Sequence, residues 1–188
     1  MVTKLLDPKR RVLLTTAGQG ALALALPSLP FGLARAQSDY PNRSIRMMRT
    51  ERVNDPGVIA RQAQMTSVNA ALQVDLLDQA NASRINHKIF SGFGGSTDFI
   101  VGSLHSRGGR SFIALPSWHP KAQVSTIVPR LTENITSFQH SFVVTEQGAA
   151  ACFGRTQSEQ ALNLITHAAH PDAKEELIAA ASELKLLN

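Results

Sequence analysis

A chain of 188 residues with 43% hydrophobic and 18% charged residues is long and apolar enough for one domain with a core and a short appendage. Its net charge of +5 is uneven, because residues 1–36 hold five basic and one acidic residue and the remainder holds 14 basic and 13 acidic residues. A nearly neutral body with one Trp and one Tyr excludes nucleic acid as a partner, and a single cysteine excludes an internal disulfide framework.

The first 36 residues have the three parts of an export signal. A basic group, Lys9-Arg10-Arg11, precedes an apolar stretch, Val12–Leu26, and a small-x-small site, Ala34-Arg35-Ala36, closes the segment. The pair Arg10-Arg11 favours a twin-arginine leader. A surface amphipathic helix is the alternative, but residues 21–26 have no polar face. We expect an unpacked leader over residues 1–36, a linker over 37–50 and a folded domain over 51–188, with a periplasmic location if the leader functions.

The segment that follows the leader carries a resemblance of its own. The run Asp39–Met48 resembles the mature start of the periplasmic solute-binding proteins of tripartite tricarboxylate transporters. The similarity ends at about Met48, because the proline- and glycine-rich ligand loop of that family does not follow.

Beyond Arg49 the pattern alternates between strands and helices. Asp55 suits the N-cap of a helix and Pro56 its first position, and together they predict a helix that runs to about Val68. Thr156 and Glu159 form a capping box, which predicts a helix that buries Leu162, Ile165 and Ala169. A last helix, from about Pro171, is predicted to bury Leu177, Ile178, Ala181 and Leu184. The predicted strands are Ala71–Leu76, Lys88–Phe90, Arg110–Pro116, Ser125–Pro129 and Ser141–Glu146. This order predicts an α/β fold with a mainly parallel sheet flanked by helices.

A glycine cluster stands between one predicted strand and the next helix. Gly92, Gly94 and Gly95 follow Lys88–Phe90 and precede a helix-like run, Phe99–Leu104. Amides at such a helix start can bind an anion or a polarised carbonyl, and glycines let a ligand approach the backbone. A strand-to-helix turn without a ligand explains the same spacing, so both interpretations stand at this point.

Seven motifs in order resemble the C-terminal domain of the acetyl-CoA hydrolase/transferase family, within the family I CoA-transferases. They cover residues from about 51 to 182. The motifs are Val53–Pro56, Asn69–Leu76, Ser91–Phe99, Ile113–Pro116, Ile127–Pro129, Val143–Gly148 and His170–Asp172. The sequence departs from the family pattern at two places. The family usually has an aromatic residue where Gln147 stands, and an Arg-Gly pair near Phe153-Gly154.

The resemblance implies chemistry on coenzyme A thioesters. Members pass acyl groups between CoA and a small carboxylate through a glutamyl-CoA thioester, and some hydrolyse acyl-CoA. By resemblance, the backbone of Gly94 and Gly95 stabilises the oxyanion, and Gly92, Phe93, Gly94 and Gly95 lie against CoA. Arg107 is expected beside this loop, near the CoA phosphates.

The nucleophilic glutamate of the family belongs upstream of Val53, where this sequence has the leader instead. Glu146 is the alternative carboxylate, and a hydrogen-bonded structural role is the competing interpretation. We therefore expect a domain that is inactive alone and that acts with a chain supplying the other part, or as a homo-oligomer. The alternatives are an exported binding module on the same scaffold and a fusion relic without a selected function.

The remaining candidates carry less chemistry. His167 and His170 have a spacing that could hold a metal ion, but the sequence shows no third ligand, so no metal is expected, and His170 suits the start of the last helix. Ser117-Trp118-His119 is predicted to be a surface loop, and Cys152, among apolar neighbours, a buried small hydrophobe.

Overall fold

The computed structural model describes residues 44, 46–92, 94–133, 135 and 140–187, so the predicted leader lies outside the described residues. The chain divides into two units, Met1–Ile45 and Arg46–Asn188, and the helices and strands of the described residues belong to the second. Among the described residues, no helix has the length and apolar character needed to span a membrane.

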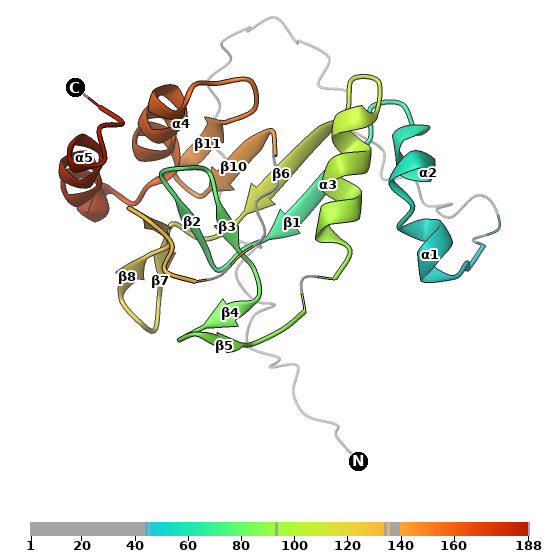
Figure 1. Ribbon diagram of the computed structural model, residues 1–188, viewed down its shortest axis with the longest axis horizontal. Helices are drawn as coiled ribbons and strands as arrows, with labels where there is room; N and C mark the ends of the chain where they lie inside the picture. The colour runs from blue at the N-terminus through green and yellow to red at the C-terminus, as the bar shows by residue number, and fades with distance from the viewer. Residues whose placement is uncertain (1–43, 45, 93, 134, 136–139, 188) are drawn as a thin grey trace, which may run out of the picture. The chain divides into compact units, whose positions relative to one another are not determined.

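A four-stranded sheet organises the second unit. Its strands lie in the order β1-β6-β10-β11, and β1, β6 and β10 run parallel (Figure 1). β11 turns back beside β10 as an antiparallel hairpin. The strands are β1 (Thr66–Ala70), β6 (Arg110–Ala114), β10 (Phe142–Thr145) and β11 (Gly148–Ala151). The predicted α/β fold with a mainly parallel sheet is confirmed.

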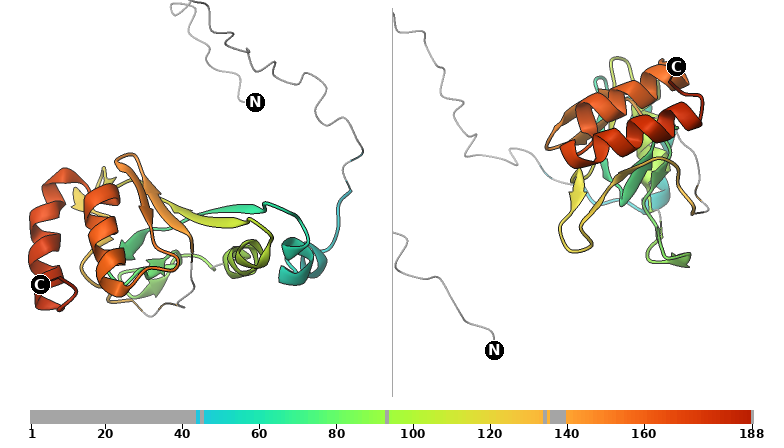
Figure 2. Two further views of the ribbon diagram at one scale, coloured as in Figure 1. Left: turned by 90° about the horizontal axis from the view of Figure 1, so that it is seen from above. Right: turned by 90° about the vertical axis from the view of Figure 1, so that its left-hand side faces the viewer.

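Helices cover one face of this sheet. α3 (Ser96–His105) packs on β1 and β6, and a π-helical segment (Leu164–Ala168) packs on β10 and β11 (Figure 2). The buried side chains Ile113, Val143 and Ala150 point to this face. On the other face Val68, Phe112 and Phe142 stand side by side in register, and Val68 is 66% exposed.

A second, three-stranded sheet has the order β3-β2-β9 and completes the core with β2 and β9 parallel. Its strands are β2 (Gln73–Asp75), β3 (Ala80–Asn81) and β9 (Ile127–Val128). Two hairpins lie outside the sheets, formed by β4 (Arg84–Ile85) with β5 (Lys88–Ile89) and β7 (Trp118–His119) with β8 (Val124–Ser125). The largest fully buried apolar side chains are Val74, Leu76, Ile100, Ile113, Ile127, Val143, Leu164 and Leu177.

The N-terminal helices are shorter than the sequence predicts. α1 spans Thr50–Val53, and α2 spans Pro56–Ala60 with the Asp55 carboxylate accepting hydrogen bonds from the amides of Gly57 and Val58, as expected. The predicted extension of α2 to Val68 is wrong, because Thr66 already pairs with Arg110 in the sheet. The strand predicted over Ala71–Leu76 is shorter and occupies β2 in the second sheet.

The strand before the glycine loop is not a buried central strand. β5 is half of a hairpin, and Ile89 and Phe90 are 71% and 68% exposed. The strand predicted over Lys88–Phe90 is therefore part of a surface hairpin, and period and composition do not distinguish such a hairpin from a core strand.

The C-terminal helices follow the predicted caps. Thr156 and Glu159 form the capping box of α4 (Gln157–Asn163), which continues into the π-helical segment, and Ile165 and Ala169 are buried as expected. A short 3₁₀ turn, Pro171–Ala173, leads into α5 (Lys174–Glu183), which buries Leu177 and Ala181. Leu162 and Ile178 are half exposed, contrary to the prediction, because the buried stripe on each helix is narrower than its apolar pattern.

Candidate functional site at the carboxyl edge of the sheet

The glycine loop ends at the N-terminus of α3. Gly94 has a φ of +57°, a left-handed conformation that favours glycine, and Gly95 is the N-cap residue. Gly95 makes no side-chain cap, and the positive end of the α3 dipole lies beside the glycine loop. Phe93 lies outside the described residues.

The space around this loop is open. A Cβ on Gly94 would meet no atom within 4 Å, whereas one on Gly95 would overlap the Asn54 side chain. Gly94 and Gly95 line a shallow depression of about 700 Å³. The other residues that line it are Thr50, Glu51, Asn54, Asp55, Pro56 and Asp98. Three of these side chains are carboxylates, so the depression suits a neutral carbonyl group better than a phosphate.

The loop lies at the carboxyl edge of the main sheet. The Ser106 hydroxyl, just after α3, accepts a hydrogen bond from the Met65 amide (3.1 Å), and Met65 immediately precedes β1. The C-terminal end of α3 is therefore at the amino edge of the sheet, and its N-terminal end, with the glycine loop, is at the opposite edge.

Arg107 does not lie beside the glycine loop. It follows the C-terminal end of α3, and the ten residues of this helix separate the two by about 15 Å. The expected proximity of Arg107 to the loop is therefore wrong, and its contact with CoA phosphates stays a prediction.

Glu146 and Ser117 join the carboxyl ends of two neighbouring strands. Ser117 lies beyond the end of β6, and Glu146 directly follows β10. The Glu146 carboxylate accepts hydrogen bonds from the Ser117 amide (2.9 Å) and from the Ser117 hydroxyl, one at each oxygen. These bonds, the hydroxyl foremost, lower the pKa of Glu146 from its ordinary 4.5 to about 2. The carboxylate is ionised and held in place by groups of its own chain.

A family model that matches most of the chain decides the family. The acetyl-CoA hydrolase/transferase C-terminal domain matches residues 35–181. The chain belongs to this family. The resemblance of the seven sequence motifs is thereby confirmed.

The region that matches relatives in the acetyl-CoA hydrolase/transferase family covers about a third of their length. A succinyl-CoA:cyclohexane-1-carboxylate CoA transferase of Geobacter metallireducens is 39% identical over 76% of this chain and 33% of its own length. A 4-hydroxybutyrate coenzyme A transferase of Clostridium kluyveri is 38% identical over 73% of this chain and 33% of its own. The crystal structure of RipA from Yersinia pestis matches with a TM-score of 0.67 and 40% identity, over 72% of this chain and 31% of that one. The chain thus spans about a third of these proteins.

Two of the minor candidates, His170 and Ser117, have structural roles in this domain. His167 is exposed, whereas the Nδ1 of His170 accepts a hydrogen bond from the Asp172 amide (3.3 Å) and caps the 3₁₀ turn, as expected. The predicted surface loop at Ser117 is wrong, because Ser117 is fully buried and the half-buried Trp118 ring lies 4.7 Å from the His170 ring. Ser117 was missed because its partner, Glu146, is on a different strand.

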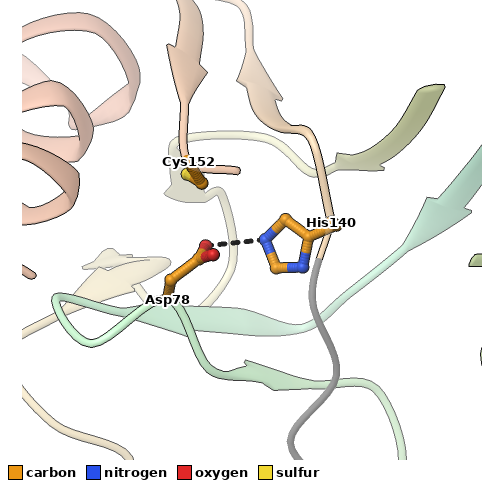
Figure 3. Close-up of side chains that lie close together, drawn as sticks. All are labelled: Asp78, His140 and Cys152. Carbon is orange, nitrogen blue, oxygen red and sulfur yellow. Dashed lines mark ion pairs between the residues drawn. The ribbon is translucent and has the colours of Figure 1, made fainter. Parts of the chain in front are cut away.

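A second group of reactive side chains escaped the sequence analysis. Asp78, His140 and Cys152 converge in the interior (Figure 3), although they come from three separate parts of the chain. Cys152 is buried, as predicted, but its neighbours include an acid and an imidazole as well as apolar side chains. No local spacing could have found this cluster, because the fold alone brings the three residues together.

Proposed function

We propose that this domain holds the thioester of an acyl-CoA, with the backbone amides of Gly94 and Gly95 directed at the thioester oxygen. The supporting observation is the glycine loop, in which Gly94 and Gly95 line a depression at the N-terminus of α3. Donors placed where an oxyanion develops contribute roughly 3–4 kcal/mol to an acyl transfer. Gly92 and Phe93 complete the proposed contact with CoA.

The carboxylate that attacks the thioester is proposed to come from outside the described residues. Of the acids near the loop, Glu51 is exposed and pairs with Arg49 (3.2 Å). Glu146 has both oxygens bonded to Ser117, which supports a structural role for it. In this proposal the domain acts with a chain that supplies the remaining two thirds of the relatives' length, and the acyl acceptor is a small carboxylate or water.

The location is a separate proposal. The leader-like pattern of residues 1–36 supports export to the periplasm, whereas acyl-CoA is a cytoplasmic metabolite. N-terminal sequencing of the protein from fractionated cells distinguishes a periplasmic from a cytoplasmic location. Cleavage after Ala36 in the periplasmic fraction supports export, and an intact Met1 contradicts it.

The binding proposal is tested with two glycine variants. Gly94→Ala and Gly154→Ala place the same methyl group at positive φ, +57° and +73°, and neither Cβ meets an atom within 4 Å. The two changes therefore carry similar backbone strain, about 1–2 kcal/mol each. Acetyl-CoA binding, measured by calorimetry, should weaken at least tenfold in Gly94→Ala and remain unchanged in Gly154→Ala.

Three results decide the outcome. Loss of binding in Gly94→Ala alone supports the loop as the thioester site. Equal losses in both variants, or no binding of acetyl-CoA by the unchanged protein, contradict it and favour the alternative of a binding module that uses the fold as a scaffold. Release of free CoA thiol by the unchanged protein would contradict the proposal that the nucleophile lies elsewhere.

A further inference from the structure

Three side chains with metal-binding atoms meet where the two sheets adjoin. Asp78 lies in the turn after β2, His140 lies just before β10 and Cys152 just after β11 (Figure 3). The Nε2 of His140 is 2.7 Å from the Oδ1 of Asp78, and the three ligand atoms all lie within 4.8 Å of one another. His140 and Cys152 have no exposed surface, and the Asp78 side chain is 9% exposed.

The donor set identifies the class of ion. Thiolate and imidazole ligands select zinc and its neighbours among the transition metals, whereas magnesium and calcium take oxygen ligands. In a tetrahedral zinc site the bonds are about 2.0–2.3 Å, which places ligand atoms roughly 3.3–3.7 Å apart. The carboxylate and imidazole, 2.7 Å apart, would separate by up to about an ångström. The longest separation in the cluster, up to 4.8 Å, would shorten by roughly 1.1–1.5 Å, so side-chain shifts of about an ångström complete the site.

The backbone of the Asp78 turn directs the carboxylate inward. Asp78 has a φ of +61°, which is uncommon for a residue with a side chain. The turn is fixed by Asp75, whose carbonyl accepts a hydrogen bond from the Asp78 amide and whose Oδ1 accepts bonds from the amides of Leu77 and Gln79. An uncommon conformation that is held so firmly, and that ends in a buried carboxylate, points to a role for that carboxylate.

A nucleophilic Cys-His-Asp arrangement does not fit the same residues. In such a triad the imidazole stands between the thiol and the acid and the thiol is accessible. Here the carboxylate of Asp78 contacts both partners, and burial and then the Asp78 charge raise the pKa of the Cys152 thiol. A buried, protonated thiol is not a nucleophile.

We propose that Asp78, His140 and Cys152 bind one zinc-class metal ion, which replaces the thiol proton and links the two sheets. Three protein ligands leave a fourth position for the second carboxylate oxygen or for water. The ion would balance the charge of the Asp78 carboxylate and of the thiolate that forms when the Cys152 proton leaves, since buried charges are costly without a counter-charge. This site is independent of the glycine loop and of the proposed acyl-CoA function, and it differs from the sequence-level expectation of no metal.

The full chain, stripped with a chelator, tests this assignment with two probes. Co²⁺ should bind at one equivalent per chain and give a thiolate-to-cobalt charge-transfer band in the near ultraviolet. Zn²⁺ at 100 times its dissociation constant should raise the unfolding midpoint by about 5–10 °C. Cys152→Ser should abolish the charge-transfer band, and Asp78→Asn should weaken Co²⁺ binding at least tenfold.

The variants are chosen so that loss of binding is not loss of folding. Asn adopts positive φ readily, so Asp78→Asn retains the turn while it removes the charged ligand. His167→Ala is the control, since it removes an exposed histidine away from the cluster. Binding that is lost in Asp78→Asn and Cys152→Ser but kept in His167→Ala supports the site. Absence of the cobalt band in the unchanged protein, or equal binding by all variants, overturns it.

Discussion

At the scale of single residues, the bond between Glu146 and Ser117 links β10 to β6 beyond their last ladder pairs. Since folding lowers the pKa of Glu146 from 4.5 to about 2, the contribution of this carboxylate to stability is complete above pH 4.5. It is lost as the pH falls through the window from 4.5 to 2, where the unfolded chain takes up the proton first.

Glu146→Gln should remove this pH-dependent contribution. We expect the variant to be less stable than the unchanged protein at neutral pH, with the difference shrinking as the pH is lowered from 4.5 to 2. Urea unfolding midpoints at a series of pH values measure it. Two stability curves that stay parallel across this window would show that the carboxylate is not held as the structure indicates.

At the scale of elements, α4 depends on its first turn. The Glu159 amide donates to the Thr156 hydroxyl (3.3 Å) and the Glu159 carboxylate accepts from the Thr156 amide (2.8 Å), and the helix carries the buried Ala161. Thr156→Ala should lower the free energy of unfolding by about 1 kcal/mol, whereas Thr156→Ser, which keeps the hydroxyl, should leave it nearly unchanged. Chemical denaturation of the two variants checks this, and equal losses would contradict a capping role.

The elements that the sequence predicted well are those fixed by neighbouring residues. The caps at Asp55 and Thr156 were identified because cap, first turn and apolar stripe lie within a few residues. The end of α2 was not predicted correctly, because the pairing of Thr66 with β6 determines where the chain becomes a strand. The contact between Ser117 and Glu146 and the cluster of Asp78, His140 and Cys152 were not predicted either, because in each case the partners are distant in the sequence.

At the scale of the molecule, the described residues leave one face of the main sheet without helices. Val68, Phe112 and Phe142 form the centre of this face, and the two phenylalanine rings stack with centroids 5.3 Å apart. Val68 is exposed and the two phenylalanines are half-buried, so this face offers apolar surface to a partner. We expect this face to contact either the remaining part of a longer protein or a second copy of the chain.

Val68→Lys should weaken self-association of the chain through this face. The side chain is 66% exposed, so a lysine should fold without a large penalty while placing a charge in the contact. Val124→Lys, at a residue that is 49% exposed on the β7–β8 hairpin, is the matched control. Sedimentation velocity over a range of concentrations should show a lower association constant for Val68→Lys only, and a chain that is monomeric throughout would exclude the second copy as occupant.

The contact between Trp118 and His170 has an optical consequence. The chain has one tryptophan, so all of its indole emission originates where β7 meets the 3₁₀ turn before α5. The fluorescence of the protein therefore reports the integrity of this one junction, without a label.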